Sequence, residues 1–378
     1  MSWKETIFKL FIQLQRGYDL PRSQMKDGPY PVVGSNCIIG YHNEFKLEPP
    51  GVITGRSGTL GKVQFITTNY WPHNTALWVR DFKNNDPKFV YYKLQTLNLE
   101  KYNAGGAVPT LNRNNLDNIP VRIPLLPIQR KIASILSAYD YLIENNLRRI
   151  ALLEESAKLL YREWFVRFRF PGHEHTRIIN GVPEGWEKKK ISDVCETVGG
   201  GTPSTQKPEY WEGGDITWVI PTDITRNNCL VLLDSEKKIT EEGLKNSSAR
   251  LVPLETILMT SRASVGFFGL IDREVCTNQG FISIITHQEH YRMYLLHNFI
   301  TRREEILSKA GGTTYKEITK RTFRSFDILM PSKALLEEFQ VFAYDTIRQT
   351  RVLKKQIEKL IQARDLLLPK LMSGEIVV

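Results

Sequence analysis

The sequence predicts an α+β protein in which two homologous mixed α/β domains are joined by two long helices that form an antiparallel coiled coil. Two observations carry this prediction: the chain repeats itself, and each copy of the repeat ends in a long amphipathic segment. A chain of 378 residues also has the length of two or three domains rather than one.

The repeat joins two pairs of segments in the same order. ITGRSGTLGKVQFI, which begins at Ile53, resembles LMTSRASVGFFGLI, which begins at Leu258, and we match the arginines of the two segments, Arg56 with Arg262. The segment that begins with Ala-Gly-Gly at Ala104 resembles the one that begins at Ala310, and both end in an alternating strand before a proline. Two such pairs at nearly the same spacing indicate two homologous halves.

Each copy is followed by about 40 residues with apolar side chains at steps of three and four, the period of an amphipathic helix about 60 Å long. Helices of this length need a partner for their apolar stripe, and we expect the two to pack on each other. Asn145 and Asn146 interrupt the first stripe; they either fix its register as buried Asn residues can or face solvent, and we favour solvent. The first stripe comprises Ile128, Ile132, Ile135, Tyr139, Leu142, Ile150, Leu153, Ala157, Leu160 and Trp164, and the second comprises Thr350, Leu353, Ile357, Leu360, Arg364, Leu367 and Leu371.

The predicted boundaries follow from these segments. They are residues 1–126 for the first domain, 127–170 for the first helix, 171–332 for the second domain and 333–378 for the second helix. Within the domains, β-rich runs predict strands at residues 31–34 and 215–220. Apolar residues on one side predict a helix over residues 292–307, with a counterpart near residues 89–97.

The composition points to a basic protein with a polyanionic partner. Lys and Arg exceed Asp and Glu by 51 to 41, a net charge of +10, which suits nucleic acid; the alternative is a protein that is merely basic. The four cysteines form no CxxC pair, so neither a zinc ribbon nor a dithiol motif is expected. No signal peptide or membrane span is expected, and we expect a cytoplasmic protein.

Five segments of the sequence, taken in order, form a set that one known family shares. They are LQRGYDLP at Leu14, GPYPVVGSNCIIGYHN at Gly28, LPIQRKIASILSAYDYLIE at Leu126, GGGTPSTQKPEYWEGGDITWVIPTDIT at Gly199 and LLPKLMSGEI at Leu367. On these segments the sequence resembles the specificity subunits of type I restriction-modification systems over nearly its whole length. One departure is Cys37, where a glycine is expected in the family's pattern.

The resemblance implies two target-recognition domains on an antiparallel helical pair, with pseudo-two-fold symmetry. Each domain would read one half of a split DNA sequence, and the helices would set the gap between the halves. Two modification subunits would dock on the helices and methylate adenine with S-adenosylmethionine. Restriction subunits would add ATP- and Mg-dependent translocation and cleavage. No cofactor is expected on this chain.

Exposed loops rich in Arg, Lys, Asn and hydroxyl side chains are the candidates for DNA contact, because these groups read base edges and bind phosphates. An alternative for Arg56 and Arg262 is an ion pair within their own domains, and we expect Tyr210 and Trp211 to be packing residues. Trp164 and Phe165 are candidates for binding a partner subunit. The candidate DNA-binding residues are Arg56, Ser57, Thr59, Lys62, Asn112, Arg113, Thr202, Ser204, Thr205, Lys207, Ser261, Arg262, Ser264, Lys316 and Thr319.

Catalytic readings of the sequence fail on their own requirements. GRSGTLGKV at Gly55 has the wrong glycine spacing for a phosphate-binding loop and lacks its hydroxyl residue. Asp223 with the Glu236–Lys238 segment is too loose a set for a nuclease, and for His287, His290 and His297 we expect solvated or capping roles rather than metal binding. We therefore expect a chain without a catalytic or metal site. The rival hypothesis is a stand-alone coiled-coil interaction protein that ignores DNA.

Overall fold

The computed structural model describes residues 3–312 and 314–378, which divide into two compact units. Unit 1 comprises Met1–Glu144 with Glu358–Val378, and unit 2 comprises Asn145–Ile357. Each unit contains one globular domain and a section of both long helices, α3 (Leu126–Tyr161) and α10 (Lys333–Ser373). The two long helices are thus confirmed, but each is shared between the units instead of forming a separate body.

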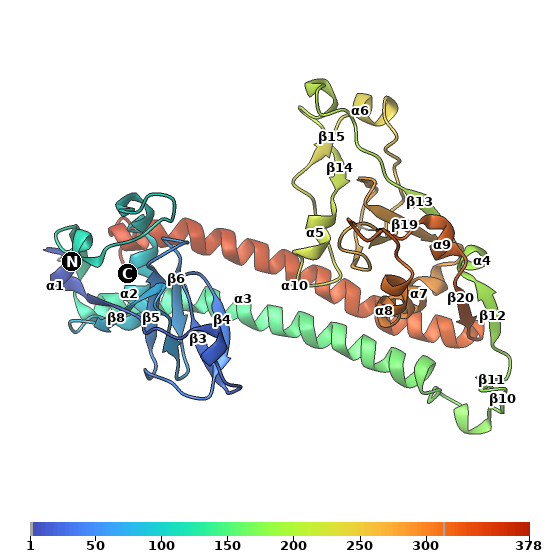
Figure 1. Cartoon of the computed structure of the whole chain (residues 1–378), viewed down its shortest axis with the longest axis horizontal. Helices are drawn as coiled ribbons and strands as arrows, with labels where there is room; N and C mark the ends of the chain where they lie inside the picture. The colour runs from blue at the N-terminus through green and yellow to red at the C-terminus, as the bar shows by residue number, and fades with distance from the viewer. Residues whose placement is uncertain (1–2, 313) are drawn as a thin grey trace. The chain divides into compact units, whose positions relative to one another are not determined.

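Domain 1, the globular part of unit 1, consists of small sheets with a short helix against them (Figure 1). The four-stranded sheet has the order β2-β8-β5-β6, the three-stranded sheet has the order β4-β3-β7, and β1 pairs with β9. The elements are β1 (Trp3–Ile7), α1 (Phe8–Phe11), β2 (Gln13–Arg16), β3 (Tyr30–Val33), β4 (Ile38–His42), β5 (Gly51–Gly55), β6 (Val63–Ile66), β7 (Trp71–Pro72), β8 (Ala76–Asp81), α2 (Pro87–Gln95) and β9 (Pro120–Pro124).

Domain 2, the globular part of unit 2, repeats this topology with additional short elements. Its sheets have the orders β13-β19-β16-β17 and β15-β14-β18, and β12 pairs with β20. The elements are β10 (Ile178–Ile179), β11 (Val182–Pro183), β12 (Glu187–Lys190), α4 (Ile191–Val194), β13 (Cys195–Gly199), β14 (Ile216–Val219), α5 (Pro221–Thr225), β15 (Lys238–Ile239), α6 (Glu241–Lys245), β16 (Ile257–Thr260), β17 (Phe268–Leu270), β18 (Cys276–Thr277), β19 (Phe281–Thr286), α7 (Arg292–Thr301), α8 (Arg303–Ser308), α9 (Lys320–Arg324) and β20 (Asp327–Met330).

The two domains agree strand by strand, which confirms that the halves are homologous. In both domains the middle strand of the three-stranded sheet pairs in parallel with one edge strand: β3 with β7, and β14 with β18. The strands predicted from their β-rich sequence are β3 and β14. The helix predicted for domain 2 is present but divides at Arg302 into α7 and α8, and its counterpart in domain 1 is α2, which Asp86 caps by accepting a hydrogen bond from the Phe89 N–H.

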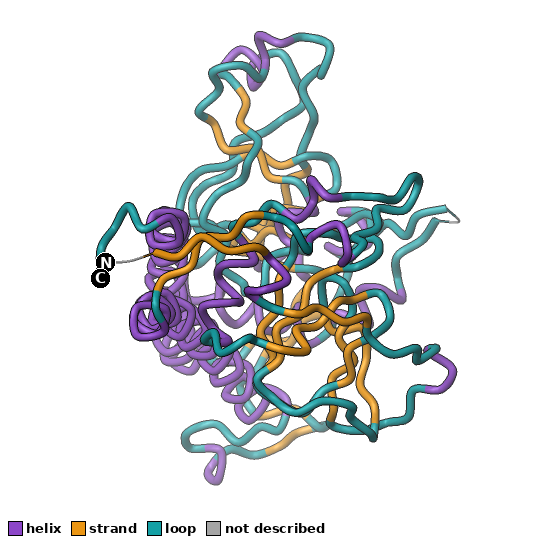
Figure 2. The backbone as a smooth tube through the Cα atoms, turned by 90° about the vertical axis from the view of Figure 1, so that its left-hand side faces the viewer, coloured by secondary structure: helices purple, strands orange, loops and turns teal. Residues whose placement is uncertain are grey.

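In unit 1 the beginning of α3 packs against the end of α10, so the helices run antiparallel there. Their side chains complete the core under domain 1 at Ile132, Leu136 and Leu371. The buried Lys93 ammonium of α2 donates to the Met372 carbonyl at 3.0 Å, and burial lowers its pKa to about 8. Figure 2 shows this end of the helices beside the termini, where Gly374 lies against the Trp3 indole.

In unit 2 the end of α3 packs against the beginning of α10, again antiparallel. Tyr161 of α3 lies against Phe339 of α10, with ring centroids 5.9 Å apart, and both belong to the main core of domain 2. Helix and domain therefore share one hydrophobic core in each unit, which explains why α3 and α10 are stable at this length.

The predicted stripe of α10 is confirmed at four buried positions, with Leu360, Arg364 and Leu367 partly buried, whereas that of α3 is wrong in part. Thr350, Leu353, Ile357 and Leu371 of α10 are buried. On α3, however, Ile135 and Leu142 are exposed, and the buried positions in this region include Ile132 and Leu136. The packed face of α3 follows the 3.6-residue period of the helix. A strict seven-residue repeat drifts around such a helix, so the predicted stripe leaves the packed face at some positions.

Asn146 also departs from the favoured prediction. Asn145 is exposed as expected, but Asn146 is only 6% exposed and donates from Nδ2 to Gln356 Oε1 of α10 at 3.3 Å. A buried amide that finds a partner on the opposite helix favours one register, because shifting the helices would leave it without that partner.

The first helix ends earlier than residue 170, in a wide π-helical turn at Arg162–Val166. This turn places Phe165 in the core, 7% exposed, where its ring contacts Tyr294 and Phe339. Trp164 is partly buried and packs against the same cluster. The prediction of partner binding is therefore wrong for Phe165, whose ring is used within unit 2, whereas Trp164 is partly exposed and its partner role stays a prediction.

The prediction of a solvated or capping role is wrong for His297 of α7. Its side chain is buried, only 3% exposed, and its ring packs against Tyr161 and Phe339. Burial lowers the pKa of its imidazole to about 4. Across the residues that the structure describes, no helix is both long and apolar enough to cross a bilayer.

This burial predicts a loss of stability in mild acid. The folded pKa lies below the unfolded value of about 6.5, so only the unfolded chain takes up the proton as the pH falls. The free energy of unfolding should fall between pH 6.5 and 4, by about 3 kcal/mol from this group. Urea unfolding of the full chain across this window should show the loss; His297→Leu should flatten it, whereas His287→Leu, at an exposed position, should not. An equal slope in wild type and His297→Leu would contradict the assignment.

Candidate nucleic-acid interface

Most of the candidate DNA-binding residues lie at one end of the four-stranded sheet of each domain, which we call the loop edge. In domain 1 the loop edge is formed by residues 17–19 after β2, 56–59 after β5, 73–75 before β8 and the segment 109–111. In domain 2 it is formed by residues 200–202 after β13, 261–264 after β16, 278–280 before β19 and the segment 316–318.

Main-chain hydrogen bonds hold these loops in the same way in both domains. The Arg56 N–H donates to the Thr75 carbonyl at 2.8 Å, and the Arg56 carbonyl accepts from the Leu111 N–H at 2.8 Å. In domain 2 the Ser261 N–H donates to the Gly280 carbonyl at 2.7 Å, and its carbonyl accepts from Ile318 at 3.0 Å.

This pairing corrects the alignment of the repeat by one residue. Gly55 pairs with Ala76 and Thr260 with Phe281, so Arg56 corresponds to Ser261 and not to Arg262. Arg262 corresponds instead to Ser57, and each of these bridges to the neighbouring segment, at Glu317 and Thr110. Because successive side chains of extended backbone point to opposite faces, Arg56 and Arg262 do not occupy equivalent places.

The one-residue correction changes what two candidates can do. Ser261 is 3% exposed and enclosed by its hydrogen-bonded neighbours, so the prediction that it contacts DNA is wrong. Arg262 is half exposed and lies 3.7 Å from a carboxylate oxygen of Glu317, a loose surface ion pair. Arg56 is partly buried, and its Nη1 donates to the Asn74 carbonyl at 3.3 Å.

A glycine lets the first loop approach the third loop closely in each domain. A Cβ on Gly17 would lie 2.1 Å from the His73 carbonyl oxygen, and one on Gly200 would lie 2.1 Å from the Asn278 carbonyl oxygen. The following N–H groups, of Tyr18 and Gly201, each donate at 2.8 Å to the carbonyl of the residue just before the third loop, Pro72 or Thr277. These glycines are required by the close backbone approach.

The loop edge also holds side chains that the sequence analysis missed. The Asn74 amide donates to the Asp19 carboxylate in domain 1, and this bond is the main cause of a lowered pKa of Asp19. At the equivalent place in domain 2, the predicted candidate Thr202 donates to Gln279 Oε1 at 2.5 Å. The signal was present in GYDLP and GGGTPST, but only the strand pairing brings residues 55 to 77 positions apart together.

The remaining candidates are surface residues in varied local roles. Asn112 and Thr319 cap short helical turns. Arg113 donates to the Leu14 carbonyl at 3.3 Å, away from the loop edge, and Lys207 donates to the Tyr210 hydroxyl at 3.0 Å. The other candidates are exposed or partly exposed: Ser57, Thr59, Lys62, Ser204, Thr205, Ser264 and Lys316.

Tyr210 and Trp211 are packing residues, as predicted. Tyr210 is 5% exposed, and the Trp211 ring packs edge-on against Trp218 with centroids 5.0 Å apart. Asp223 accepts from the Ile220 N–H and the Ser235 hydroxyl, so it caps a turn. Within residues 3–312 and 314–378, no group of three or more His, Cys, Asp and Glu side chains is placed to hold a metal ion.

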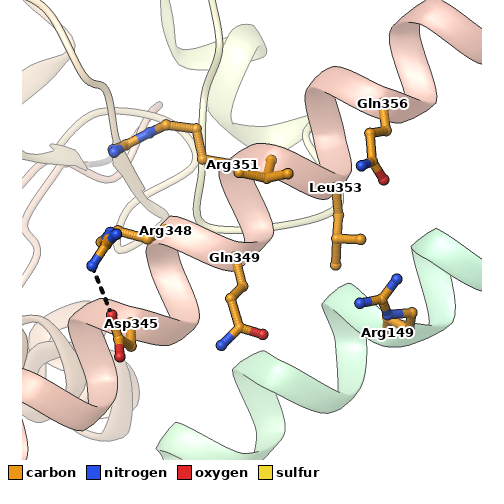
Figure 3. Close-up of a pocket in the computed structure, with 8 residues that line it drawn as sticks. Arg149, Asp345, Arg348, Gln349, Arg351, Leu353 and Gln356 are labelled. Carbon is orange, nitrogen blue, oxygen red and sulfur yellow. Dashed lines mark hydrogen bonds and ion pairs between the residues drawn. The ribbon is translucent and has the colours of Figure 1, made fainter.

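Two of the hollows in unit 2 lie near the loop edge or the long helices. One, of about 370 Å³, opens at the loop edge of domain 2, where Arg262, Gln279, Thr225 and Tyr315 are among its lining residues. The other, of about 580 Å³, lies along α10 beside Arg149 of α3 (Figure 3). Two arginines in the α10 hollow are engaged, Arg348 with Asp345 and Arg351 with Glu255, so this hollow belongs to the helix packing.

The fold and the loop edges define a duplicated protein with two equivalent display surfaces, each on its own section of an antiparallel helical pair. The profile of the family described as "Type I restriction modification DNA specificity domain" matches residues 10–155 and 183–360. The chain belongs to this family, as the sequence resemblance predicts.

Relatives and a solved structure agree with this assignment. The chain is 29% identical over 355 residues to the type I restriction enzyme EcoR124I/EcoR124II specificity subunit of Escherichia coli, covering 87% of this chain and 83% of that protein. It is 37% identical over 171 residues to the MjaIX specificity subunit of Methanocaldococcus jannaschii, an alignment that spans 45% of this chain and 39% of that protein. The S subunit structure from M. genitalium shares the fold, with a TM-score of 0.62 at 16% identity, over 98% of this chain and 96% of that one.

The close approach of the first and third loops predicts a matched pair of glycine substitutions. Gly17→Ala and Gly200→Ala should each lower the free energy of unfolding by roughly 1–3 kcal/mol, because the new methyl group meets backbone that cannot rotate away. Gly106→Ala and Gly311→Ala serve as controls, since a Cβ there meets nothing within 4 Å. Chemical denaturation of the four variants is the measurement, and equal stability of the two pairs would contradict the packing.

Proposed function

We propose that this chain is a DNA sequence-specificity subunit in which each domain reads one half of a bipartite target. The observation that carries the proposal is the repetition of one loop edge, with corresponding backbone hydrogen bonds and different side chains, in both domains. A reader built twice on one backbone, with different side chains, suits a target with two unlike halves.

The exposed groups of the loop edges support direct reading of bases. Amide, hydroxyl and guanidinium groups supply the donors and acceptors that match base edges in the major groove. The net charge of +10 supplies the attraction to phosphate that all DNA binding requires. We expect the chain to act in the cytoplasm, where its DNA target lies.

The partners are part of the proposal. Two modification subunits would dock on the long helices and carry S-adenosylmethionine, and restriction subunits would carry ATP and Mg; the chain itself would be non-catalytic. Since Phe165 is a core residue and Trp164 is only partly exposed, the docking surface is proposed on the exposed apolar side chains of the helices. These include Tyr141, Leu142, Leu147, Leu152 and Leu159 on α3, and Val341, Phe342, Val352 and Leu366 on α10.

The alternative, a stand-alone coiled-coil interaction protein, gains no support from the comparisons. A DNA-free role would also give the repeated loop edges no use. Salt separates the two functions, because a DNA reader loses affinity steeply as salt rises.

The proposal predicts a split methylation motif. Expression of this chain with its modification subunit in a host without that system should methylate adenines in a motif of two defined halves with a fixed gap. Arg262→Ala should reduce base discrimination by roughly 1–3 kcal/mol at one position of the half-site read by domain 2. The other half-site should be unaffected, because Arg262 belongs to the loop edge of domain 2 and not to that of domain 1. Sequencing of modified adenines measures both outcomes.

Arg177→Ala is the control, because Arg177 is exposed in the link before domain 2 and lies outside the loop edge. Equal damage to both halves by Arg262→Ala would contradict the division of labour between the domains. Absence of both methylation and salt-sensitive DNA binding would contradict the proposed function itself.

A further inference from the structure

Asn74 and Gln279 occupy the same place in the two domains. Each stands two residues before the central strand of its sheet, β8 or β19. The residue before each one donates its N–H to the last residue of the neighbouring strand, His73 to Val33 at 2.8 Å and Asn278 to Val219 at 3.1 Å. Both positions carry a side-chain amide at the loop edge.

A second side chain supports each amide from the first loop. Asp19 directly follows Tyr18, whose N–H donates to Pro72 at the end of β7. Thr202 directly follows Gly201, whose N–H donates to Thr277 at the end of β18. Asp19 accepts from the Asn74 amide, and Thr202 bonds to the Gln279 amide. The same pair of places is thus filled by two chemically different pairs of residues.

The two supports turn the amides in opposite senses. A carboxylate only accepts hydrogen bonds, so Asp19 draws the NH₂ group of Asn74 towards itself and leaves Oδ1 as the outward group. The Thr202 hydroxyl donates to Oε1 of Gln279, which leaves the NH₂ group outward. Within the described part of the chain, neither Asn74 Oδ1 nor Gln279 Nε2 has a hydrogen-bond partner.

Exposure and shape make both amides available to a ligand. Asn74 is partly exposed and Gln279 is exposed. Gln279 also lines the hollow of about 370 Å³, beside the apolar side chains of Pro221, Ala263 and Tyr315. The hollow thus combines one outward hydrogen-bond donor, Gln279 Nε2, with apolar lining. This combination suits the edge of a base pair, which presents polar atoms beside a methyl group or ring carbon.

We propose that Asn74 and Gln279 each determine one base pair of the target, with opposite hydrogen-bond polarity. Asn74 Oδ1 accepts from an exocyclic amino group in the major groove, that of cytosine or adenine. Gln279 Nε2 donates to an acceptor, the N7 or O6 of guanine, the N7 of adenine or the O4 of thymine. Asp19 and Thr202 are positioning residues that set the polarity, and the inference rests on the proposed function.

The experiment uses the full chain in complex with its modification subunits and a duplex library randomised at each position of the mapped target. Asn74→Ala should reduce selectivity by about ten- to a hundredfold at one position of the half read by domain 1. Gln279→Ala should do the same at one position of the other half. The readout is the ratio of methylation of preferred and other bases, which a general loss of stability does not change at a single position.

Controls come from amides at the other end of the same domains. Asn114 is exposed and lines a hollow with Lys83, beyond the far end of β8, and Gln288 is exposed beyond the far end of β19. Asn114→Ala and Gln288→Ala should leave selectivity at every position unchanged.

Polarity is tested by the supporting residues and by reversal. Thr202→Val should relax the position that Gln279 reads, and Thr202→Ser, which keeps the hydroxyl, should restore it. Asp19→Asn can donate to or accept from Asn74, so it should weaken the preference for a base with an amino group. Gln279→Glu replaces the outward donor by an acceptor and should shift the preference towards cytosine or adenine.

The outcomes separate the two hypotheses. If the wild-type complex reads a bipartite target but Asn74→Ala and Gln279→Ala leave every position unchanged, the inference is wrong and the proposed function stands. If Gln279→Glu relaxes its position without shifting preference towards an amino group, the assigned polarity is wrong. If the wild-type complex reads no target in the library, the proposed function fails, and this inference fails with it.

Discussion

The loop edges depend on a small set of main-chain hydrogen bonds. The N–H and carbonyl groups of Arg56 tie the second loop of domain 1 to the third and fourth segments, and those of Ser261 do the same in domain 2. Since these bonds use only backbone atoms, they fix the loops without regard to side-chain identity. The backbone hydrogen bonds therefore fix the position of each side chain, and the residue type fixes which hydrogen-bond donors and acceptors it presents.

Each domain is also tied to the helices by polar contacts that differ between the units. In unit 1, Arg364 of α10 binds Asp140 of α3 at 2.7 Å, and the Tyr92 hydroxyl donates to the same carboxylate at 2.5 Å. In unit 2, Arg351 of α10 binds Glu255 at 2.8 Å, although Glu255 is 5% exposed and has a positive φ of 62°. The Arg364–Asp140 pair is partly exposed, whereas the Arg351–Glu255 pair is largely buried. A buried pair contributes little net stability, because desolvation offsets its attraction, but removing one partner is costly. The effect of the two pairs is to hold each domain at one place on its helices.

The sequence predicted the features that arise from long-range periodicity. Two homologous halves and two long helices both follow from patterns that span many residues, so the mismatch of a single residue does not hide them. What it missed depends on register. One residue decides whether Arg56 matches Ser261 or Arg262, and a similar shift decides whether Ile135 or Leu136 faces the core. Phe165 looked like docking surface because the π-helical turn that buries it has no sequence pattern of its own.

The same separation explains how such a chain can change what it reads. Gly17 and Gly200 are constrained, since any side chain there would meet a carbonyl at 2.1 Å. Asp19 and Thr202 are exposed and less constrained: Thr202 bonds to Gln279, and Asp19 bonds to Asn74 and to the half-exposed Arg16. Surface substitutions of this kind usually change stability by less than about 0.5 kcal/mol, whereas reversing one donor and one acceptor changes base discrimination by roughly 1–3 kcal/mol. Substitutions at these positions can therefore change base discrimination by more free energy than they change stability. A supporting residue that does not touch the ligand can reverse the hydrogen-bond polarity of the amide that does.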